Sequence, residues 1–196
     1  MSRELTAETV VSRLRGRFGL PYLFVQRCTS TQRLLDTDAP EGAVAVAEVQ
    51  TEGRGRLGRR WEAKSGTSIL CSIALRPPVE PPRLPELSLV AGEACAAAIA
   101  AVTGLRPTLK FPNDVLIEGR KVAGILAEAR DGRVVLGIGI NVNASTEELP
   151  AGTVTPATSL SAESGRKIDR TELLVALLEQ VELQYHGWLT GLRSPR

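Results

Sequence analysis

The stretch VVLGIGINVN, residues 134–143, constrains the fold more than any other part of the chain. Side chains of a β-strand point alternately to its two faces, so the leucine, isoleucines and valine at every second position form one apolar face. The other face carries Gly137, Gly139, Asn141 and Asn143. Glycine inside a strand weakens the sheet unless another group lies against it. The segment predicts a strand with a core face and a hollow face, which is either the floor of a ligand site or the place of a bulge or close helix packing.

The rest of the chain mixes strand-like and helical segments. Apolar runs with β-branched residues predict strands over residues 22–26, 43–49, 67–75 and 121–129. Helical patterns are found over residues 7–16, 30–36 and 86–102, and after Asp169. An Asp-Gly pair predicts a hairpin just before residue 134, and residues 144–168 look like loop. Together these segments predict an α+β fold, in which helices pack on a mixed β-sheet.

Two of the helices have recognisable ends. Pro85 is placed to begin the 86–102 helix, and Gly104 is placed to end it. Asp169 and Glu172 make a capping arrangement for the last helix. Its predicted apolar face consists of Leu174, Leu177, Leu178, Val181, Tyr185 and Trp188.

Composition and charge exclude several classes of protein. A chain of 196 residues with 43% hydrophobic content suits one domain with a real core. Its net charge of +2 is too small for a dedicated nucleic-acid binder, so any positive field is local. The amino-terminal segment lacks the apolar core of a secretory signal, and no apolar run reaches membrane-spanning length. The three cysteines lie too far apart for a disulfide framework or a metal site, so we expect a reduced, cytoplasmic protein.

Local positive charge is concentrated in GRGRLGRRW, residues 53–61, between two predicted strands. Glycines let a backbone wrap closely around a ligand, and arginine forks match phosphate or carboxylate geometry. The four arginines also repel one another, so we expect this loop to be mobile until an anion orders it. A solvated basic loop is the alternative interpretation.

Gly53, Gly55 and Gly58 also satisfy the G-x-G-x-x-G pattern of a dinucleotide-binding turn. Such a turn opens a helix and is followed by an acidic residue roughly 20 positions later. Here the chain continues into a strand, and residues 71–78 contain no acid. The pattern therefore does not favour a dinucleotide site.

A second polar segment, KFPNDVLIEGRKVAGILAE, covers residues 110–128. Pro112, Asn113 and Asp114 form a turn-like entry to a strand, and the last two carry polar groups that suit ribose hydroxyls, phosphate or a magnesium ion.

Lys121 begins the strand that follows. Simple alternation places it on one face with Ala123 and Ile125, and places Gly124 on the other face. Taken by itself, Lys121 is explained better by a solvated hairpin position than by a catalytic role.

Together these segments resemble the catalytic domain of the biotin protein ligases, also called biotin–[carboxylase] ligases or holocarboxylase synthetases. The match rests on four motifs in the family's order and spacing, namely STQ at 30–32, Gln50 with GRGRLGRRW, the segment 110–128 and GIGINVN at 137–143. It covers roughly residues 22–190. The resemblance implies the catalytic fold of biotin and lipoate ligases, which is similar to that of class II aminoacyl-tRNA synthetases.

The resemblance also implies roles for the residues at matching positions. The residues expected at biotin are Ser30, Thr31, Gln32, Gln50, Gly53, Arg54, Gly55, Arg56, Trp61, Lys121, Gly124, Gly137 and Gly139. The residues expected at ATP are Arg56, Arg59, Trp61, Lys110, Asn113, Asp114 and Asn141. The implied catalytic residues are Lys121, Arg54 and Arg56. Asp114 is the expected ligand of a Mg²⁺ cofactor, and Ser30 has a second interpretation as a simple helix cap.

The implied reaction has two steps. A carboxylate is a poor electrophile, so biotin first attacks the α-phosphate of ATP, and biotinyl-5′-AMP forms as pyrophosphate leaves. Arginine, lysine and magnesium stabilise the phosphate charge, and no histidine base is needed, since the only histidine, His186, lies in the last predicted helix. A lysine of the biotin carboxyl carrier protein domain of acetyl-CoA carboxylase or a related carboxylase then displaces AMP. No nucleic-acid or membrane partner is expected, and an exposed sheet edge is compatible with a homodimer.

The sequence departs from the family pattern in three places. Phe111 stands where the family usually has tryptophan, a mild aromatic exchange. About twenty residues precede the first predicted strand, too few for the winged helix of members that act as repressors. The chain ends at Arg196, about where a small SH3-like barrel begins in the family. We therefore expect residues 1–196 to form a single catalytic domain without either addition.

Two alternative functions remain open. Lipoate ligases and octanoyltransferases share the fold, but they are expected to carry a glycine-rich run near a histidine, which this chain lacks before His186. A non-catalytic biotin or nucleotide sensor is the second alternative, and pyrophosphate exchange separates an enzyme from a sensor.

Overall fold

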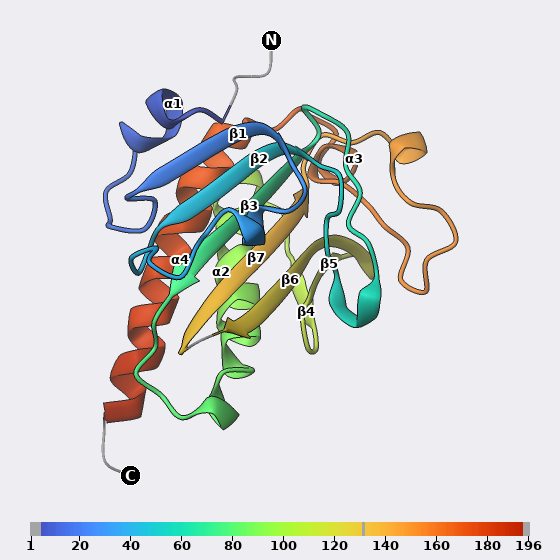
Figure 1. Cartoon of the computed structure of the whole chain (residues 1–196). Coiled ribbons are helices and arrows are strands. Elements are labelled where there is room, and N and C mark those ends of the chain that lie inside the picture. The colour runs from blue at the N-terminus through green and yellow to red at the C-terminus, as the bar shows by residue number, and fades with distance from the viewer. Residues whose placement is uncertain (1–4, 131, 194–196) are drawn as a thin grey trace.

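The computed structural model describes residues 5–130 and 132–193, and their elements follow the predicted order along the chain (Figure 1). The strands are β1 (Tyr22–Cys28), β2 (Val44–Gln50), β3 (Ser68–Leu75), β4 (Thr108–Lys110), β5 (Asp114–Ile117), β6 (Arg120–Arg130) and β7 (Arg133–Asn141). The α-helices are α1 (Ala7–Val11), α2 (Glu86–Thr103), α3 (Leu160–Ser164) and α4 (Arg170–Arg193). Short 3-10 turns are found at Thr31–Arg33, Arg56–Gly58, Pro81–Arg83 and Thr146–Glu148.

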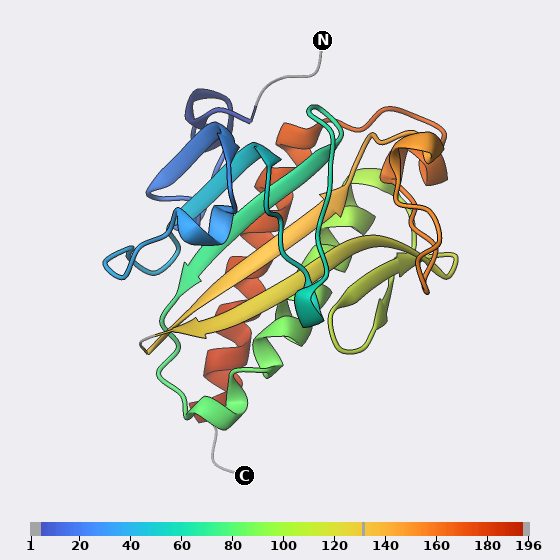
Figure 2. The ribbon, with the colours of Figure 1, turned by 45° about the vertical axis from the view of Figure 1, so that its right-hand side comes forward.

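The seven described strands form one mixed sheet in the order β1-β2-β3-β7-β6-β5-β4. β1 runs parallel to β2, and the remaining described neighbours are antiparallel. α2 and α4 lie side by side against one face of the sheet, while the turns and long loops gather on the other (Figures 1 and 2). The predicted α+β fold with a mixed sheet is confirmed.

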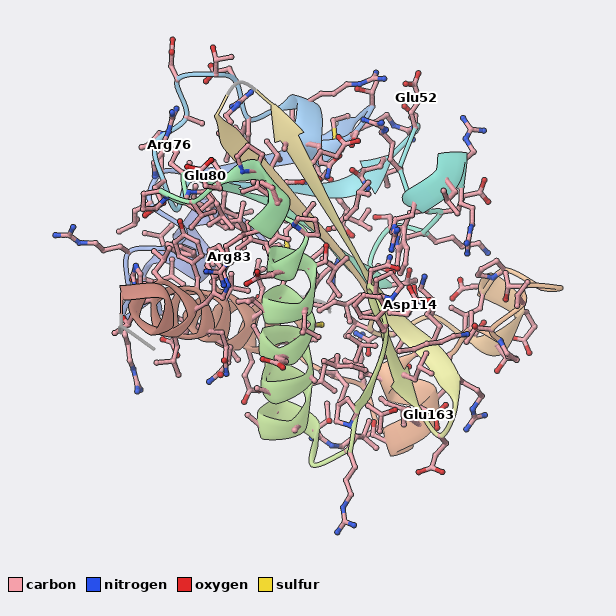
Figure 3. All side chains as sticks on the ribbon, turned by 90° about the horizontal axis from the view of Figure 1, so that it is seen from below. Glu52, Arg76, Glu80, Arg83, Asp114 and Glu163 are labelled. Carbon is pink, nitrogen blue, oxygen red and sulfur yellow. The ribbon has the colours of Figure 1, made fainter. Side chains whose placement is uncertain are left out.

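The core lies between the sheet and the two long helices. In β7 the predicted alternation holds, because Leu136, Ile138 and Ile140 are all at most 2% exposed and belong to the main core cluster. α4 contributes most of the opposing surface, with buried Leu173, Leu174, Leu177, Leu178, Val181 and Tyr185. Trp188 packs at the edge of this cluster, where the Arg83 guanidinium lies over its ring (Figure 3).

The predicted ends of both long helices are confirmed. α2 ends at Gly104, whose φ of 75° lies in the left-handed region that glycine enters most easily. Asp169 caps α4, since its Oδ1 accepts a hydrogen bond of 2.8 Å from the backbone N–H of Thr171.

Two predicted helices are shorter than expected because tertiary contacts capture their ends. α1 stops at Val11, and the following chain is drawn onto α4, where the Glu182 carboxylate accepts the backbone N–H groups of Arg17 and Phe18. The helix predicted over residues 30–36 is a single turn, Thr31–Arg33.

The predicted loop at residues 144–168 contains a short helix that was missed. Ser159 caps α3 by accepting a hydrogen bond of 3.2 Å from Ala162 N, and Leu160 is buried beneath it. Gly165, with a φ of 68°, ends it. One cap and one buried leucine are too little pattern to predict a helix from sequence. The turn predicted from Asp-Gly falls on residue 131, which lies outside the described residues.

One helix, Pro81–Thr103, is long and apolar enough to cross a membrane by length and composition, contrary to the expectation from the sequence. This is weak support for a membrane span, because core helices pass the same test. Leu87, Ala91 and Ala94 of α2 are buried in the main core cluster, as in a core helix.

A buried ion pair ties α4 to the sheet. Arg170 donates to both carboxylate oxygens of Glu48 on β2, at 2.9 and 3.2 Å, and to the carbonyl oxygen of Ser68 at 3.0 Å. The side chains of Arg170 and Glu48 are only 2% and 6% exposed. Glu48 also accepts the backbone N–H of Gly66, just before β3 begins. The pair therefore joins the start of α4 to the end of the loop that carries the arginines.

Removing one partner of this pair leaves a buried charge without compensation. We expect Arg170→Met to lower the free energy of unfolding by about 3–5 kcal/mol, as measured by urea denaturation. The matched control is Arg33→Met, which breaks an ion pair with Glu52 whose two side chains are each 50% exposed. That control should cost at most about 1 kcal/mol, and equal losses in the two variants would contradict the structural role of Arg170.

Candidate functional site

A cavity of about 480 Å³ lies on the face of the sheet away from α2 and α4. Its floor is formed by β6 and β7, including the glycines of the hollow face. Its walls come from the turn at Thr31–Arg33, the arginine loop, the start of β5 and the loop before α3. Figure 2 shows the turn at Thr31–Arg33 and the arginine loop in front of the sheet. Segments far apart in sequence thus meet at one place, as the four motifs predicted.

Every site residue predicted from the sequence lines this cavity, with the exception of Gly53. A Cβ at Gly53 would lie 2.2 Å from the carbonyl oxygen of Trp61 and 3.2 Å from Gln50 Nε2. Gly53 therefore allows close approach of two parts of the wall to each other. Gly53 itself does not line the cavity, and its place next to a ligand stays a prediction.

The arginine loop forms a hairpin in the structure. The N–H of Trp61 donates to the carbonyl of Gly53 at 2.9 Å, and the N–H of Gly55 donates to that of Arg59 at 2.8 Å. The turn is at Leu57 and Gly58, with φ of 57° and 73°, and the leucine side chain is 85% exposed. The expected mobility of the loop before an anion binds stays a prediction.

Trp61 covers the glycine face of the sheet. A Cβ at Gly139 would lie 2.6 Å from Trp61 Cε2, and a Cβ at Gly124 would lie 2.9 Å from Trp61 Cζ3. The flat group that the glycine floor accommodates is therefore an indole of the chain itself. Within the described part of the chain, the buried indole Nε1 has no hydrogen-bond partner.

The inner end of the cavity is neutral and polar. Gln50 Oε1 accepts the backbone N–H of Thr31 at 2.7 Å, and Thr31 Oγ1 lies 2.8 Å from Ser72 Oγ. Gln32 Nε2 donates to the carbonyl of Leu126 at 3.0 Å. Gln32 Oε1 is buried, and none of the described residues donates a hydrogen bond to it.

The face predicted for Lys121 was wrong, although its place in the site was right. In the pairing of β5 with β6, Val115 faces Ala123 but Leu116 faces Lys121, so the register shifts at Val122. Val122 and Ala123 are consecutive and both fully buried. This irregularity reverses the alternation and turns Lys121 toward the cavity, where its Nζ lies 3.3 Å from the Cβ position of Gly124.

Lys121 is held by two neighbours. Its ammonium lies 2.6 Å from Asp114 Oδ1 and 5.7 Å from the centre of the Trp61 ring, a distance that suits a cation–π contact. Asp114 begins β5, beside the loop that precedes α3 (Figure 3). The site thus places one cation above the glycine floor.

More cations line the outer part of the cavity. Arg56 Nη1 lies 3.4 Å from Asn113 Oδ1, and Lys110 donates to Thr155 Oγ1 at 2.6 Å. Among residues 5–130 and 132–193, neither Arg56 nor Arg59 forms an ion pair with an acidic side chain. The inner end of the cavity is therefore neutral and its outer part is positively charged. This distribution suits a ligand with a neutral head and an anionic tail.

The donor set fits a magnesium ion only in part. The described residues contain no group of three or more His, Cys, Asp or Glu side chains that could hold a metal. Asp114 is one of the carboxylates that line the cavity, and it already forms an ion pair with Lys121. Mg²⁺ commonly keeps several waters and takes only one or two carboxylates, with phosphates as the other ligands. The site fits an ion that arrives with phosphates better than a resident one.

Several cavity residues were not predicted. Leu126 shares a face of β6 with Gly124, which was predicted, so alternation was a usable signal there, whereas Ser72 lies on β3, where no site residue was predicted. Pro150, Val154 and Ala157 come from a segment read as plain loop, and no pattern in it indicates a site. Cys71 also lines the cavity, but burial raises the pKa of its thiol to about 12. The thiol therefore stays protonated and is a poor nucleophile.

Comparison with known families and proteins points to one family. The model of the biotin/lipoate A/B protein ligase family matches residues 24–145. The bifunctional ligase/repressor BirA of Bacillus spizizenii is 41% identical over 176 residues, which are 85% of this chain and 54% of BirA. The biotin–[acetyl-CoA-carboxylase] ligase of Mycobacterium tuberculosis is 40% identical over 152 residues, which are 76% of this chain and 56% of that protein. The chain thus spans about half the length of these curated relatives.

Solved structures give the same result. The biotin protein ligase of Aquifex aeolicus in complex with biotin and ATP superposes with a TM-score of 0.78 at 34% identity. The match covers 86% of this chain and 71% of the Aquifex chain. The catalytic fold expected from the resemblance is therefore confirmed.

The contact between Trp61 and the glycine floor is testable. We expect Gly139→Ala to displace the indole, because overpacking costs about 1–3 kcal/mol and the indole is free to move outward. In a Trp188→Phe background, which leaves Trp61 as the only tryptophan, fluorescence emission should shift to the red. The control is Gly187→Ala, where an added Cβ meets nothing within 4 Å. Unchanged emission in Gly139→Ala would mean that the indole does not rest on the sheet.

Proposed function

The chain belongs to the biotin/lipoate A/B protein ligase family, and within that family we propose that it activates biotin with ATP and transfers it to a protein lysine. The curated relatives named above are ligases of biotin or ligase/repressors, and the Aquifex aeolicus ligase binds biotin and ATP. Because the chain spans about half the length of its curated relatives, each step of the reaction is proposed from the site itself.

The observation that carries the proposal is the polar inner end of the cavity. Gln32 Oε1 is buried there without a donor among the described residues, and the hydroxyls of Thr31 and Ser72 lie beside the same recess. A buried acceptor without a partner costs about 1–3 kcal/mol, which a ligand N–H recovers. The ureido ring of biotin has two N–H donors and a carbonyl acceptor. The alkyl and dithiolane ends of octanoate and lipoate have no such donor, so the recess favours biotin.

The cations above the floor suit the activation step. With the ureido ring in the recess, the valeryl chain would extend past Trp61, which covers the glycines, and would bring its carboxylate toward Lys121 and the hairpin. A carboxylate oxygen attacks the α-phosphorus of ATP, the bond to the bridging oxygen breaks, and pyrophosphate leaves. Lys121, Arg54 and Arg56 stabilise the negative charge on the carboxylate and phosphate oxygens by position and electrostatics. No proton transfer is required in this step.

The outer cavity suits the nucleotide. Arg59, Lys110, Asn113 and Asn141 all line the cavity. The first two would bind the phosphates, and the two asparagines would bind polar groups of the nucleotide. The exposed ring of Phe111 offers an apolar surface to a base. Mg²⁺ would supply charge neutralisation on the phosphates when it is bound, and Asp114 would be its protein ligand.

The second step transfers the biotinyl group. The amine of an acceptor lysine attacks the acyl carbon of biotinyl-5′-AMP, the carbon–oxygen bond breaks, and AMP leaves. The proposed acceptor is the biotin carboxyl carrier domain of acetyl-CoA carboxylase or a related carboxylase, by likeness to relatives that carry this name. We place this reaction in the cytoplasm, as a single catalytic domain, and a homodimer is a further part of the proposal.

Exchange of labelled pyrophosphate into ATP tests the function directly. We expect exchange that depends on biotin and Mg²⁺ and is absent with lipoate or octanoate. Lipoate-dependent exchange would move the protein to the rival branch of the family. Tight biotin binding without any exchange would make it a sensor.

Lys121 is expected to act on the reacting charges. Lys121→Ala should slow biotin-dependent exchange by roughly 100-fold or more, which is the usual scale for loss of one charge-stabilising donor. The control is Lys64→Ala, since Lys64 lies outside the cavity and its side chain is 67% exposed. Equal rates in the two variants would return Lys121 to a merely structural role.

A further inference from the structure

Glu128 forms a bidentate ion pair, called the fork below, with Arg54 of the hairpin. Arg54 Nη1 donates to Glu128 Oε2 at 2.9 Å, and Arg54 Nη2 lies 2.8 Å from Glu128 Oε1. Two parallel bonds between a guanidinium and a carboxylate fix orientation as well as distance. The Glu128 side chain is only 19% exposed, and it lies behind Arg54 without lining the cavity itself.

The fork acts at the base of the hairpin. Arg54 is paired with Arg60 across the two arms, next to the backbone bond between Gly53 and Trp61. Glu128 lies on β6, and strand alternation places it on the same face as Gly124 and Leu126. Glu128 of the sheet thus binds one arm of the hairpin, while Trp61 of the other arm lies on the glycine floor.

The charge of Glu128 divides the hairpin into two parts. At the base, its carboxylate neutralises Arg54 and weakens the repulsion among the four arginines. At the tip, Arg56 and Arg59 have no acidic partner among the described residues. The base is therefore fixed without a ligand, while the tip retains its charge for an incoming anion.

The fork leaves Arg54 able to bind a second acceptor. A guanidinium has five N–H donors, and the fork with Glu128 uses one on each Nη. The Nε–H and the second N–H of each Nη remain. Glu128 therefore orients Arg54 without blocking it.

From these contacts we infer that Glu128 is a positioning residue, which fixes the base of the arginine hairpin and aims Arg54 at the carboxylate of the substrate. This inference deepens the proposed function and rests on it where it names the substrate. Glu128 acts through Arg54, and it does not need to touch any reacting atom. It also predicts a hairpin that is fixed at its base before any ligand arrives.

The first arm of the test needs no substrate. Hydrogen exchange of the 53–61 peptide is measured in the ligand-free protein for the wild type, Glu128→Gln and Glu128→Asp. Glu128→Gln should exchange about threefold faster, the scale of one partly exposed ion pair, and Glu128→Asp, which keeps the charge, should recover at least half of the protection. The control is Glu52→Gln, which breaks the Arg33–Glu52 pair on the outside of the molecule (Figure 3) and should leave the peptide unchanged.

The second arm measures biotin-dependent pyrophosphate exchange. Because Glu128 acts by aiming Arg54 at the substrate carboxylate, Glu128→Gln should lower kcat/KM for biotin about fivefold, mainly through a higher KM. Glu52→Gln should change neither constant. A lower KM in Glu128→Gln would show that Glu128 competes with the substrate, and an unchanged KM would show that Arg54 needs no orienting; either result overturns the inference.

The hydrogen-exchange and pyrophosphate-exchange experiments can contradict the positioning role and the proposed function independently. Absence of exchange in the wild-type protein would remove the proposed function and leave the first arm valid. Equal protection of the peptide in Glu128→Gln and the wild type would overturn the positioning role even if biotin is the substrate.

Discussion

The two-faced strand β7 is the constraint on which the rest of the structure depends. Its aliphatic side chains seal the core under α2 and α4, and the glycines between them leave room for the site. A Cβ at Gly139 would collide with the Trp61 indole, and a Cβ at Gly137 would lie 2.8 Å from Gln32 Nε2. The same strand therefore builds the core on one side and the cavity on the other, so the site cannot be moved without altering the core.

Neutral polar groups lie at the inner end of the cavity, and charged side chains lie at its outer end, where water can solvate them. The inner end is buried, where an unpaired charge is costly, and it presents amides and hydroxyls. The outer end is open to water, and it keeps arginine and lysine side chains without that penalty. The carboxylates near it are already engaged, Asp114 with Lys121 and Glu128 with Arg54. These pairs place the cations without filling all of their hydrogen-bonding capacity.

The layer of loops over the sheet is attached to the helical layer at one buried point. Glu48 bonds Arg170 of α4 and also the backbone of Gly66, where the arginine loop returns to β3. At its other end the loop leaves β2 at Gln50, whose side chain holds Thr31. Both ends of the loop therefore lie next to residues of β2, and the tip of the hairpin is the part left to respond to a ligand.

The sequence by itself determined five of the seven described strands, the capped long helices and the motifs that meet at the cavity, because strand alternation, Asp and Gly caps and glycine spacing are local patterns. The short strand β4 was not predicted, and β5 was predicted without bounds. Only the tertiary structure decided where Lys121 points, because a register shift against β5 depends on which strand lies opposite. It also decided that Trp61 lies on the glycine floor and that Glu128 holds Arg54, a contact across 74 positions. Such pairs leave no periodic trace in a sequence, since they arise only when packing brings two separate strands or loops together.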